Sequence, residues 1–231
     1  LAVIKANAYG HGLVQVARIL DSADAFAVAR LEEAVQLREA GIRKRLVILG
    51  GCGTAEELHT AANLAIDIVV HAPEHLVLLE KSGDATPVWC WLKVDTGMAR
   101  LGLPVSAASD AIMRLNHCPA VSGITLMSHL ACADDQQDAA TVKQLASFGT
   151  LLQGWQGDVS IANSAAILQW PDAVRNTGIL SYTGRNWVRP GLMLFGASPI
   201  PSRSAAELGL KPAMSFETRL ISVKLVRKGQ R

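Results

Sequence analysis

The sequence is poor in the features that mark membrane, nucleic-acid-binding and metal proteins. None of its apolar runs approaches the ~18 residues that a membrane span needs. The 22 basic and 20 acidic residues are interspersed and leave a net charge of +2, which favours neither a nucleic-acid groove nor a polybasic membrane patch. His71 and His75 lie near one another, but Pro73 separates them and no HExxH pattern is present, so we expect no metal site.

Cysteine is scarce as well, and its spacing is informative. The cysteines form no CxxC pair, which disfavours a zinc knuckle or a thioredoxin-type redox site; they are Cys52, Cys90, Cys118 and Cys132. We expect them to be buried thiols of a reducing compartment, which indicates a cytoplasmic protein. The chain begins with Leu1 inside an apolar run, so we expect a fragment, with any targeting segment lying upstream of it.

The sequence does contain a repeated pattern of short apolar runs and amphipathic stretches, within a composition that is 50% hydrophobic. The runs predict strands at Leu1–Lys5, Asp24–Ala29, Arg45–Gly50, Ala65–Val70, Val88–Asp95, Gly123–His129, Val159–Asn163 and Trp187–Arg189, the last continuing into Leu192–Gly196. The stretches between them predict helices at Gly12–Leu20, Leu31–Ala40, after Thr54, at Pro73–Lys81, from about Ser106, and at Asp138–Trp155 and Ser164–Trp170. Strands that alternate with helices indicate parallel βαβ units.

Eight such units favour an α/β fold, a (β/α)8 TIM-type barrel, over an open doubly wound sheet. The absence of a GxGxxG motif after the first strand also disfavours a dinucleotide-binding sheet. We expect the barrel to occupy residues 1–197. We expect residues 198–231 to form a linker and, at Ala213–Val226, the first strand of a truncated C-terminal β domain. Trp89 and Trp91 share one face of the fifth strand, where barrel packing is expected.

Polar residues at the ends of the predicted strands locate the site, because the active sites of such barrels lie where strands pass into loops. They are Lys5, Arg30, Gly50, His71, Asp95, His129, Asn163, Ser164 and Arg189. Lys5 ends an apolar strand and enters a glycine-containing turn. A lysine amine at the mouth of an apolar barrel loses solvation, which lowers its pKa and makes it a nucleophile. The position is equally compatible with a lysine that reaches from a strand edge to solvent.

A second candidate element follows the seventh strand, where Asn163 and Ser164 open a helix. Free N–H groups, the helix dipole and the Ser164 hydroxyl together favour an anion site, although Ser164 taken alone is more typical of a helix cap. Gly191, after the eighth strand, is placed to bring another N–H group to the same anion, as in barrels that bind phosphate after strands seven and eight. A lysine facing a phosphate site suggests a phosphorylated aldehyde cofactor, and pyridoxal 5′-phosphate is the natural candidate.

The motifs of the chain, taken in order, resemble those of the alanine racemases. They are Lys5–Gly12, Lys93–Gly102, Ser128–Ala131, Asn163–Ala165 and Trp187–Gly191. The first looks like the cofactor-lysine signature of the family, which is highly specific, and the resemblance extends to about Pro199. It implies the barrel domain of a fold-type III pyridoxal phosphate enzyme, an isomerase that interconverts L- and D-alanine and supplies D-alanine for bacterial peptidoglycan. It also implies a homodimer in the full-length protein.

The same resemblance assigns residues to the cofactor. Lys5 would carry the cofactor aldehyde on its amine and serve as the base on the face of D-alanine. Tyr9, Ser164 and Gly191 would hold the phosphate, with Asn163 beside them. The family's base for L-alanine is a tyrosine of the C-terminal domain, supplied by the partner subunit, and we expect that domain to be cut off here.

Arginine and lysine residues complete the resemblance. Arg189 would face the pyridine nitrogen with His129 hydrogen-bonded behind it, and Arg100 would contact the ring hydroxyl oxygen and the substrate carboxylate. Lys93 resembles a lysine that is carbamylated in many members, where the new anion steadies the arginine. An arginine with its pKa above ~12 keeps its proton and cannot protonate the ring nitrogen. The ring is then a weaker electron sink, which favours racemisation over transamination.

Other functions stay open at this stage. A broad-specificity amino-acid racemase or a serine racemase would use the same barrel. The long link Asp172–Asn186 bears on that choice. We expect a small hairpin in it, bracketed by Asn176–Gly178 and Thr183–Asn186. A decarboxylase is disfavoured, because those enzymes present a carboxylate where Arg189 stands. A non-catalytic pyridoxal phosphate carrier is the remaining alternative, although such single-barrel proteins lack the second domain that Ala213–Val226 predicts.

Overall fold

The structure, a computed structural model, describes residues 1–83, 86–175 and 180–230. Within these residues the strands form a parallel sheet in the order β1–β2–β3–β4–β5–β7–β8, with the short β6 paired to β5 outside this path. The strands are β1 (Ala2–Val3), β2 (Ala25–Val28), β3 (Arg45–Ile48), β4 (Asp67–Val70), β5 (Val88–Asp95), β6 (Leu103–Pro104), β7 (Val121–Met127) and β8 (Asp158–Ser160). The expected parallel α/β architecture is confirmed, and β6 is the strand that the sequence did not predict.

The extended segment 185–190 lies between β8 and β1 and closes the barrel. Its backbone hydrogen bonds, of 2.8–2.9 Å, run from Val159 N to Arg185 O, Trp187 N to Val159 O, Arg189 N to Ala162 O, and Val3 N to Pro190 O. The predicted eighth strand at Trp187–Arg189 therefore occupies its expected place, although it is too irregular to form a full ladder. Its predicted continuation into Leu192–Gly196 is wrong, because the chain turns into a 3-10 helix there, η3 (Leu192–Phe195).

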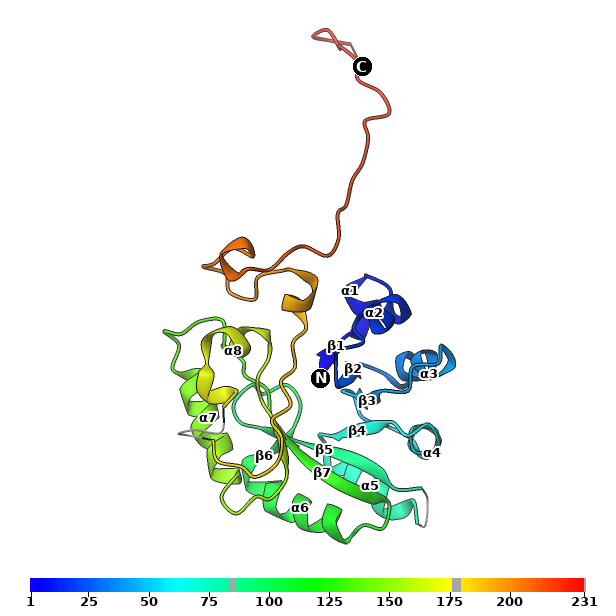
Figure 1. Ribbon diagram of the computed structural model, residues 1–231, viewed down its shortest axis with the longest axis vertical. Helices are drawn as coiled ribbons and strands as arrows, with labels where there is room; N and C mark the ends of the chain where they lie inside the picture. Colours follow the sequence, from blue (N-terminus) through cyan, green and yellow to red (C-terminus); the bar gives the residue numbers. More distant parts are fainter. Residues whose placement is uncertain (84–85, 176–179, 231) are drawn as a thin grey trace.

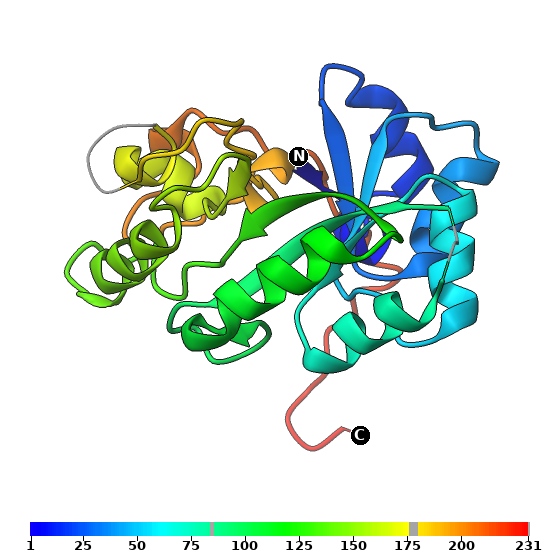
Figure 2. The same ribbon diagram turned by 90° about the horizontal axis from the view of Figure 1, so that it is seen from below.

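The helices pack on the outer side of the strands (Figure 2). They are α1 (Lys5–Tyr9), α2 (Leu13–Ile19), α3 (Leu31–Glu39), α4 (Ala55–Asn63), α5 (Pro73–Lys81), α6 (Ala108–His117), α7 (Ala140–Leu151) and α8 (Ser164–Gln169), with short 3-10 turns η1 (Val105–Ala107), η2 (Pro171–Ala173) and η4 (Ala206–Leu208). Thr54 caps α4 as predicted, since its Oγ1 accepts the Glu57 N–H at 3.2 Å. None of the helices in the described part of the chain has the length and apolarity that a membrane crossing requires.

Two apolar layers follow from the alternation of side chains along the strands. One set of strand residues packs against the helices, and the other fills the barrel interior with Leu1, Val3, Ala25, Ala27, Val47, Val69, Trp91, Met127 and Trp187. Arg45, at the start of β3, closes the floor of the barrel, the end at which the strands begin. Its Cζ lies 4.7 Å from the ring centroid of Trp89 and 5.6 Å from that of Trp91, and its Nε donates to Asp67 at 2.6 Å. The expected barrel packing of the two tryptophans is confirmed.

The chain after the barrel leaves the body of the molecule as an extended trace (Figure 1). The predicted strand at Ala213–Val226 does not form, because the described residues offer the segment no neighbouring strand to pair with. Its apolar side chains, such as Phe216 and Ile221, are fully exposed. Its assignment to a second domain stays a prediction. The cysteines are free thiols, of which Cys132 alone is more than slightly exposed. The predicted hairpin at Asp172–Asn186 depends on Asn176–Gly178, which lie outside the described residues.

Candidate active site at the barrel mouth

A cavity of about 460 Å³ opens at the end of the barrel where the strands pass into their loops. The residues that the sequence assigns to the site all line it: Lys5, Tyr9, Lys93, Arg100, His129, Asn163, Ser164, Arg189 and Gly191. They come from distant parts of the chain and meet because parallel strands bring their carboxyl ends to the same edge. Of the other predicted strand-end residues, Gly50 lines the cavity as well, whereas Arg30, His71 and Asp95 do not.

The turn that follows Lys5 is a left-handed helical turn. Ala6, Asn7, Ala8 and Tyr9 have φ values of 53–55°, a conformation that costs ~1–2 kcal/mol for each non-glycine residue. Side-chain contacts hold it, since Asn7 Oδ1 accepts the Leu13 N–H at 2.9 Å. Such strain persists only where the surroundings impose it, and it is typical of functional sites. The turn brings both Lys5 and Tyr9 to the cavity.

The groups that the sequence predicts as an anion site line the same cavity as this turn. Ser164 Oγ accepts the N–H of Gly191 at 2.9 Å and that of Met193 at 3.4 Å, so its own hydrogen is available to a ligand. The helix cap of α8 is Asn163, whose Oδ1 accepts the Ala166 N–H at 3.0 Å. The alternative interpretation of Ser164 as an ordinary cap is therefore wrong.

Gly191 allows the phenol of Tyr9 to approach this site. A Cβ atom added to Gly191 would lie 2.5 Å from Tyr9 Oη, closer than a real contact allows. Burial raises the pKa of the Tyr9 phenol, so it stays protonated and keeps a hydrogen to donate. Tyr9, Ser164 and Gly191 thus form the set of uncharged groups that border the anion site.

Arg189 is a buried cation with neutral partners. One terminal nitrogen donates to the carbonyl oxygens of Ser128 at 2.6 Å and Ile161 at 3.3 Å, and the other donates to Ser160 Oγ. Burial lowers the pKa of the Arg189 guanidinium to about 9, so the group still holds its proton at neutral pH. No carboxylate is among its partners in the described residues, and its charge therefore remains available to a ligand.

His129 stands behind this arginine, as the resemblance implies. Its Nδ1 lies 3.2 Å from an Arg189 terminal nitrogen, and because a guanidinium only donates, Nδ1 must accept. Burial lowers the pKa of His129 to about 2, with the positive charges of Arg189, Lys93 and Arg100 acting in the same direction. The imidazole is therefore neutral, with its proton on Nε2.

The cavity as a whole is cationic. Lys93 lies near the end of β5, and burial, followed by the charges of Arg189 and Arg100, lowers its pKa to about 8. Lys5 adds a further positive charge, whereas Asp134 is the one carboxylate in the lining that the structure describes. Cations forced together in this way favour an anionic ligand or an anionic modification among them.

The groups that hold Arg189 and His129 were not among the residues predicted from the sequence. Ser160 is fully buried at the end of β8, and its hydroxyl links Arg189 to the Trp187 carbonyl. Gln144 on α7 contacts the backbone next to His129. The signals were weak, since each is a single polar residue in an apolar or amphipathic stretch, where solvent exposure is the usual expectation.

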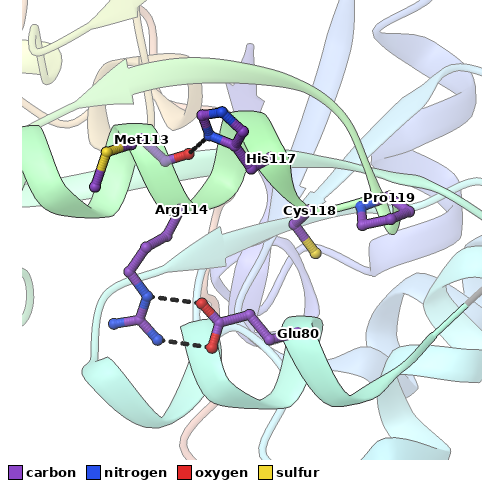
Figure 3. A pocket seen from close by; sticks show the side chains of 6 residues that line it. All are labelled: Glu80, Met113, Arg114, His117, Cys118 and Pro119. Atoms are coloured by element: carbon purple, nitrogen blue, oxygen red, sulfur yellow. Dashed lines mark hydrogen bonds and ion pairs between the residues drawn. The ribbon is translucent and has the colours of Figure 1, made fainter.

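A second hollow, shown in Figure 3, lies on the outer surface between α5 and α6. There Arg114 donates to both carboxylate oxygens of Glu80, at 2.7 and 2.8 Å. His117 Nδ1 donates to the Met113 carbonyl at 2.8 Å. The charged groups of this hollow are already paired, so it has none of the free charge that marks the barrel mouth.

His71 and His75 also make internal contacts, with His71 Nε2 donating to Gly50 O at 2.9 Å. The described residues contain no cluster of metal ligands.

Fold and site together define a parallel α/β barrel whose mouth brings Lys5 together with the groups predicted to bind an anion. The family described as alanine racemase, N-terminal domain, matches residues 1–199, and the chain belongs to this family.

Known relatives agree with this assignment. The alanine racemase of Nitrosococcus oceani is 47% identical over 99% of this chain and 62% of its own length, and that of Vibrio cholerae is 42% identical over 100% and 61%. The crystal structure of biosynthetic alanine racemase from Pseudomonas aeruginosa matches 92% of this chain and 57% of its own with a TM-score of 0.82 and 42% identity. That of Acinetobacter baumannii matches 92% and 60% with a TM-score of 0.79 and 30% identity. The chain thus spans about three fifths of the length of these relatives.

Proposed function

We propose that the protein binds pyridoxal 5′-phosphate at the barrel mouth and interconverts L- and D-alanine. The observation that carries the proposal is the meeting, in one cationic cavity, of Lys5 with the anion site at Ser164 and Gly191. The names of the related alanine racemases support alanine as the substrate. The family resemblance adds a purpose, the supply of D-alanine for peptidoglycan.

The residues present fit this cofactor. The Ser164 hydroxyl keeps a hydrogen for the phosphate, and the missing Cβ of Gly191 leaves space beside the Tyr9 phenol. Asn163 fixes the start of α8 and thereby the position of Ser164. Lys5 would hold the aldehyde end, and Arg189 the ring nitrogen. When bound, the cofactor supplies an electron sink that makes the Cα proton of an amino acid acidic.

The chain's own residues would then handle the proton and the substrate. The Lys5 amine, once free, takes or returns the proton at Cα on the face of D-alanine. Arg100, at the edge of the cavity, is placed to hold the substrate carboxylate. Arg189 keeps its own proton, so it does not protonate the ring nitrogen, and electron density stays close to Cα. Reprotonation at Cα, and hence racemisation, is favoured over transamination.

Carbamylation of Lys93 is part of the same proposal. A carbamate forms when an uncharged amine adds carbon dioxide and releases a proton to solvent, and the lowered pKa of Lys93 makes the uncharged amine accessible. The modification would replace one of the crowded positive charges by a negative one. It would then offer Arg100 an anionic partner at the cavity, where the described lining otherwise has Asp134.

A second subunit and a cytoplasmic location complete the proposal. Tyr9, Leu101 and Leu192 are 38–40% exposed and line the cavity, which favours a partner chain that covers the mouth. The family resemblance indicates that such a partner supplies the tyrosine base on the face of L-alanine. Free buried thiols support a reducing compartment.

The test is exchange of the Cα hydrogen of alanine for deuterium, followed by NMR with pyridoxal phosphate and either enantiomer. Exchange of D-alanine that is lost in Lys5→Ala is the expected result. Lys143→Ala is the matched control, since Lys143 is exposed on α7 and lies outside the cavity. Exchange of neither enantiomer by protein that holds the cofactor would refute catalysis by these residues alone. It would leave them as a holder of the cofactor and put the activity in the C-terminal domain that the family resemblance implies. Equal exchange of D-serine would favour a broader racemase.

A further inference from the structure

Gln144 is a buried polar side chain to which the proposed mechanism gives no part. It lies on α7, is 2% exposed, and makes three hydrogen bonds through its amide. Oε1 accepts the Ala131 N–H at 2.9 Å, while Nε2 donates to the His129 carbonyl at 2.9 Å and to Thr96 Oγ1 at 3.3 Å. The Gln144 amide therefore joins two loops, the one that contains Thr96 and the one that contains His129 and Ala131.

The orientation of this amide is set by its partners. The Ala131 N–H only donates and the His129 carbonyl only accepts, so Oε1 must face the first and Nε2 the second. The side chain therefore spans the loop after β7 on both sides of residue 130. A shorter side chain, or one without an amide, cannot hold both groups at once.

The same amide begins a directed chain of hydrogen bonds. Ser128 Oγ donates to the Val94 carbonyl at 2.8 Å, which leaves it to accept from Thr96 Oγ1, also at 2.8 Å. Thr96 in turn accepts from Gln144. The chain thus ties the loop after β5 to the loop after β7. It passes through Ser128, whose backbone carbonyl accepts from Arg189, and ends at the Val94 carbonyl.

We propose that Gln144 is a positioning residue that aligns the His129–Arg189 pair by clamping the loops after β5 and β7. This inference rests on the proposed function, because alignment of the His129–Arg189 pair matters for the reaction only if the pair faces the cofactor ring. The side-chain hydrogen bonds of Gln144 go to Ala131, Thr96 and His129, and not to Lys5 or the Ser164–Gly191 site, so the clamp acts mainly on the cofactor ring and little on the groups that hold the aldehyde and the phosphate. That separation makes the role measurable.

The test compares Gln144→Met, which keeps the volume and removes every hydrogen bond, with Lys143→Met on the same helix. The protein is used with pyridoxal phosphate bound. We expect Gln144→Met to lower D-alanine exchange by about 10- to 100-fold, the cost of misplacing a positioned group by about 1 Å. The dissociation constant of the cofactor should change much less than exchange does, because Lys5 and the phosphate-binding groups at Ser164 and Gly191 are untouched and Arg189 alone shifts. Lys143→Met should change neither.

A second variant and a second readout keep the inference testable if Gln144→Met folds poorly. Thr96→Val breaks the hydrogen-bond chain while leaving the backbone contacts of Gln144, and it should lower exchange by about fivefold. The ¹⁵N shift of His129 Nδ1 should move toward that of a ring without a donor in Thr96→Val, and further in Gln144→Met where that variant folds. This shift is independent of turnover.

The outcomes separate the two proposals. If exchange and the His129 shift stay at parent values in both variants, the clamp is refuted. If cofactor affinity falls as steeply as exchange, Gln144 is a general structural residue and the positioning role is wrong. If the parent protein shows no exchange, the proposed function fails, and the His129 shift alone then decides whether Gln144 aligns the pair.

Discussion

Replacing Gly191 by alanine tests the anion site with a single methyl group. The new Cβ would lie 2.5 Å from Tyr9 Oη, whereas ordinary contacts begin near ~3.5 Å, so the phenol oxygen must retreat by about 1 Å. Gly191 has φ −132°, which lies outside the left-handed region that favours glycine. We attribute the effect of the substitution to the contact with Tyr9, and a Tyr9→Phe background separates this contact from any backbone effect.

The magnitude follows from that displacement. Moving a positioned group by about 1 Å can cost about 100-fold, so we expect the dissociation constant of pyridoxal phosphate to rise by about 10- to 100-fold, or ~1.4–2.8 kcal/mol. Tyr9 is 38% exposed and able to turn toward solvent, so the fold should be little affected. The melting temperature of the cofactor-free protein should change by a few degrees at most.

The assay is a titration with pyridoxal phosphate, repeated in the presence of inorganic phosphate as a competitor. Gly53→Ala is the matched control, because a Cβ there meets Glu57 at 3.7 Å, an ordinary contact. In a Tyr9→Phe background the hydroxyl is gone, and Gly191→Ala should then cost less than about threefold. If the effects of the two substitutions on the dissociation constant are instead additive, the methyl group does not act through the phenol. The proposed contact between Gly191 and Tyr9 is then refuted.

Three further predictions concern charged groups. Lys5→Ala should abolish the absorbance of lysine-linked cofactor, and a band of unchanged intensity would remove Lys5 from the mechanism. Arg189→Glu should raise transamination relative to racemisation, because a carboxyl group can share a proton with the ring nitrogen; product analysis showing the parent ratio would contradict this. Lys93, with its pKa lowered from 10.5 to about 8, has about 300-fold more uncharged amine at pH 7 than a free lysine, and this fraction increases as the pH rises to 8. A carbamate signal from ¹³C-bicarbonate should therefore grow from pH 6 to 8 and vanish in Lys93→Gln, whereas a bare ammonium at neutral pH with bicarbonate would exclude the modification.

The fold was predictable wherever buried faces make apolar residues recur at the spacing of a strand or a helix. Strand β5 and helix α5 were located to the residue, because Val88–Asp95 alternates between two packed faces and Pro73 favours a first helical turn. The predicted strand at Leu192–Gly196 failed for a related reason: an apolar run of that length suits a 3-10 turn as well as a strand, and periodicity cannot separate them. At Ala213–Val226 the alternation is present, but the segment has no neighbour to pair with.

The site was predictable as a set of residues, but its local geometry was not. Strand ends identified Lys5, His129 and Arg189, because barrel topology brings these ends together. The left-handed turn after Lys5 could not be read from residue types, since alanine ordinarily avoids that conformation. The proposed role of Gln144 could not be predicted from the sequence either, because it depends on contacts with two loops that are distant in the chain.

The two ends of the barrel differ in how their buried arginines are paired, and the difference supports the mouth as the site of the proposed reaction. At the floor, Arg45 is bonded to Asp67 at 2.6 Å and covered by the rings of Trp89 and Trp187, so its charge is neutralised within the protein. At the mouth, Arg189 is buried as deeply as a core residue, yet its partners in the described residues are carbonyl, hydroxyl and imidazole groups. Neutral partners orient a guanidinium without cancelling its field. A buried cation left in that state costs stability, and it is tolerated where a ligand of opposite charge or a polar ring completes the site.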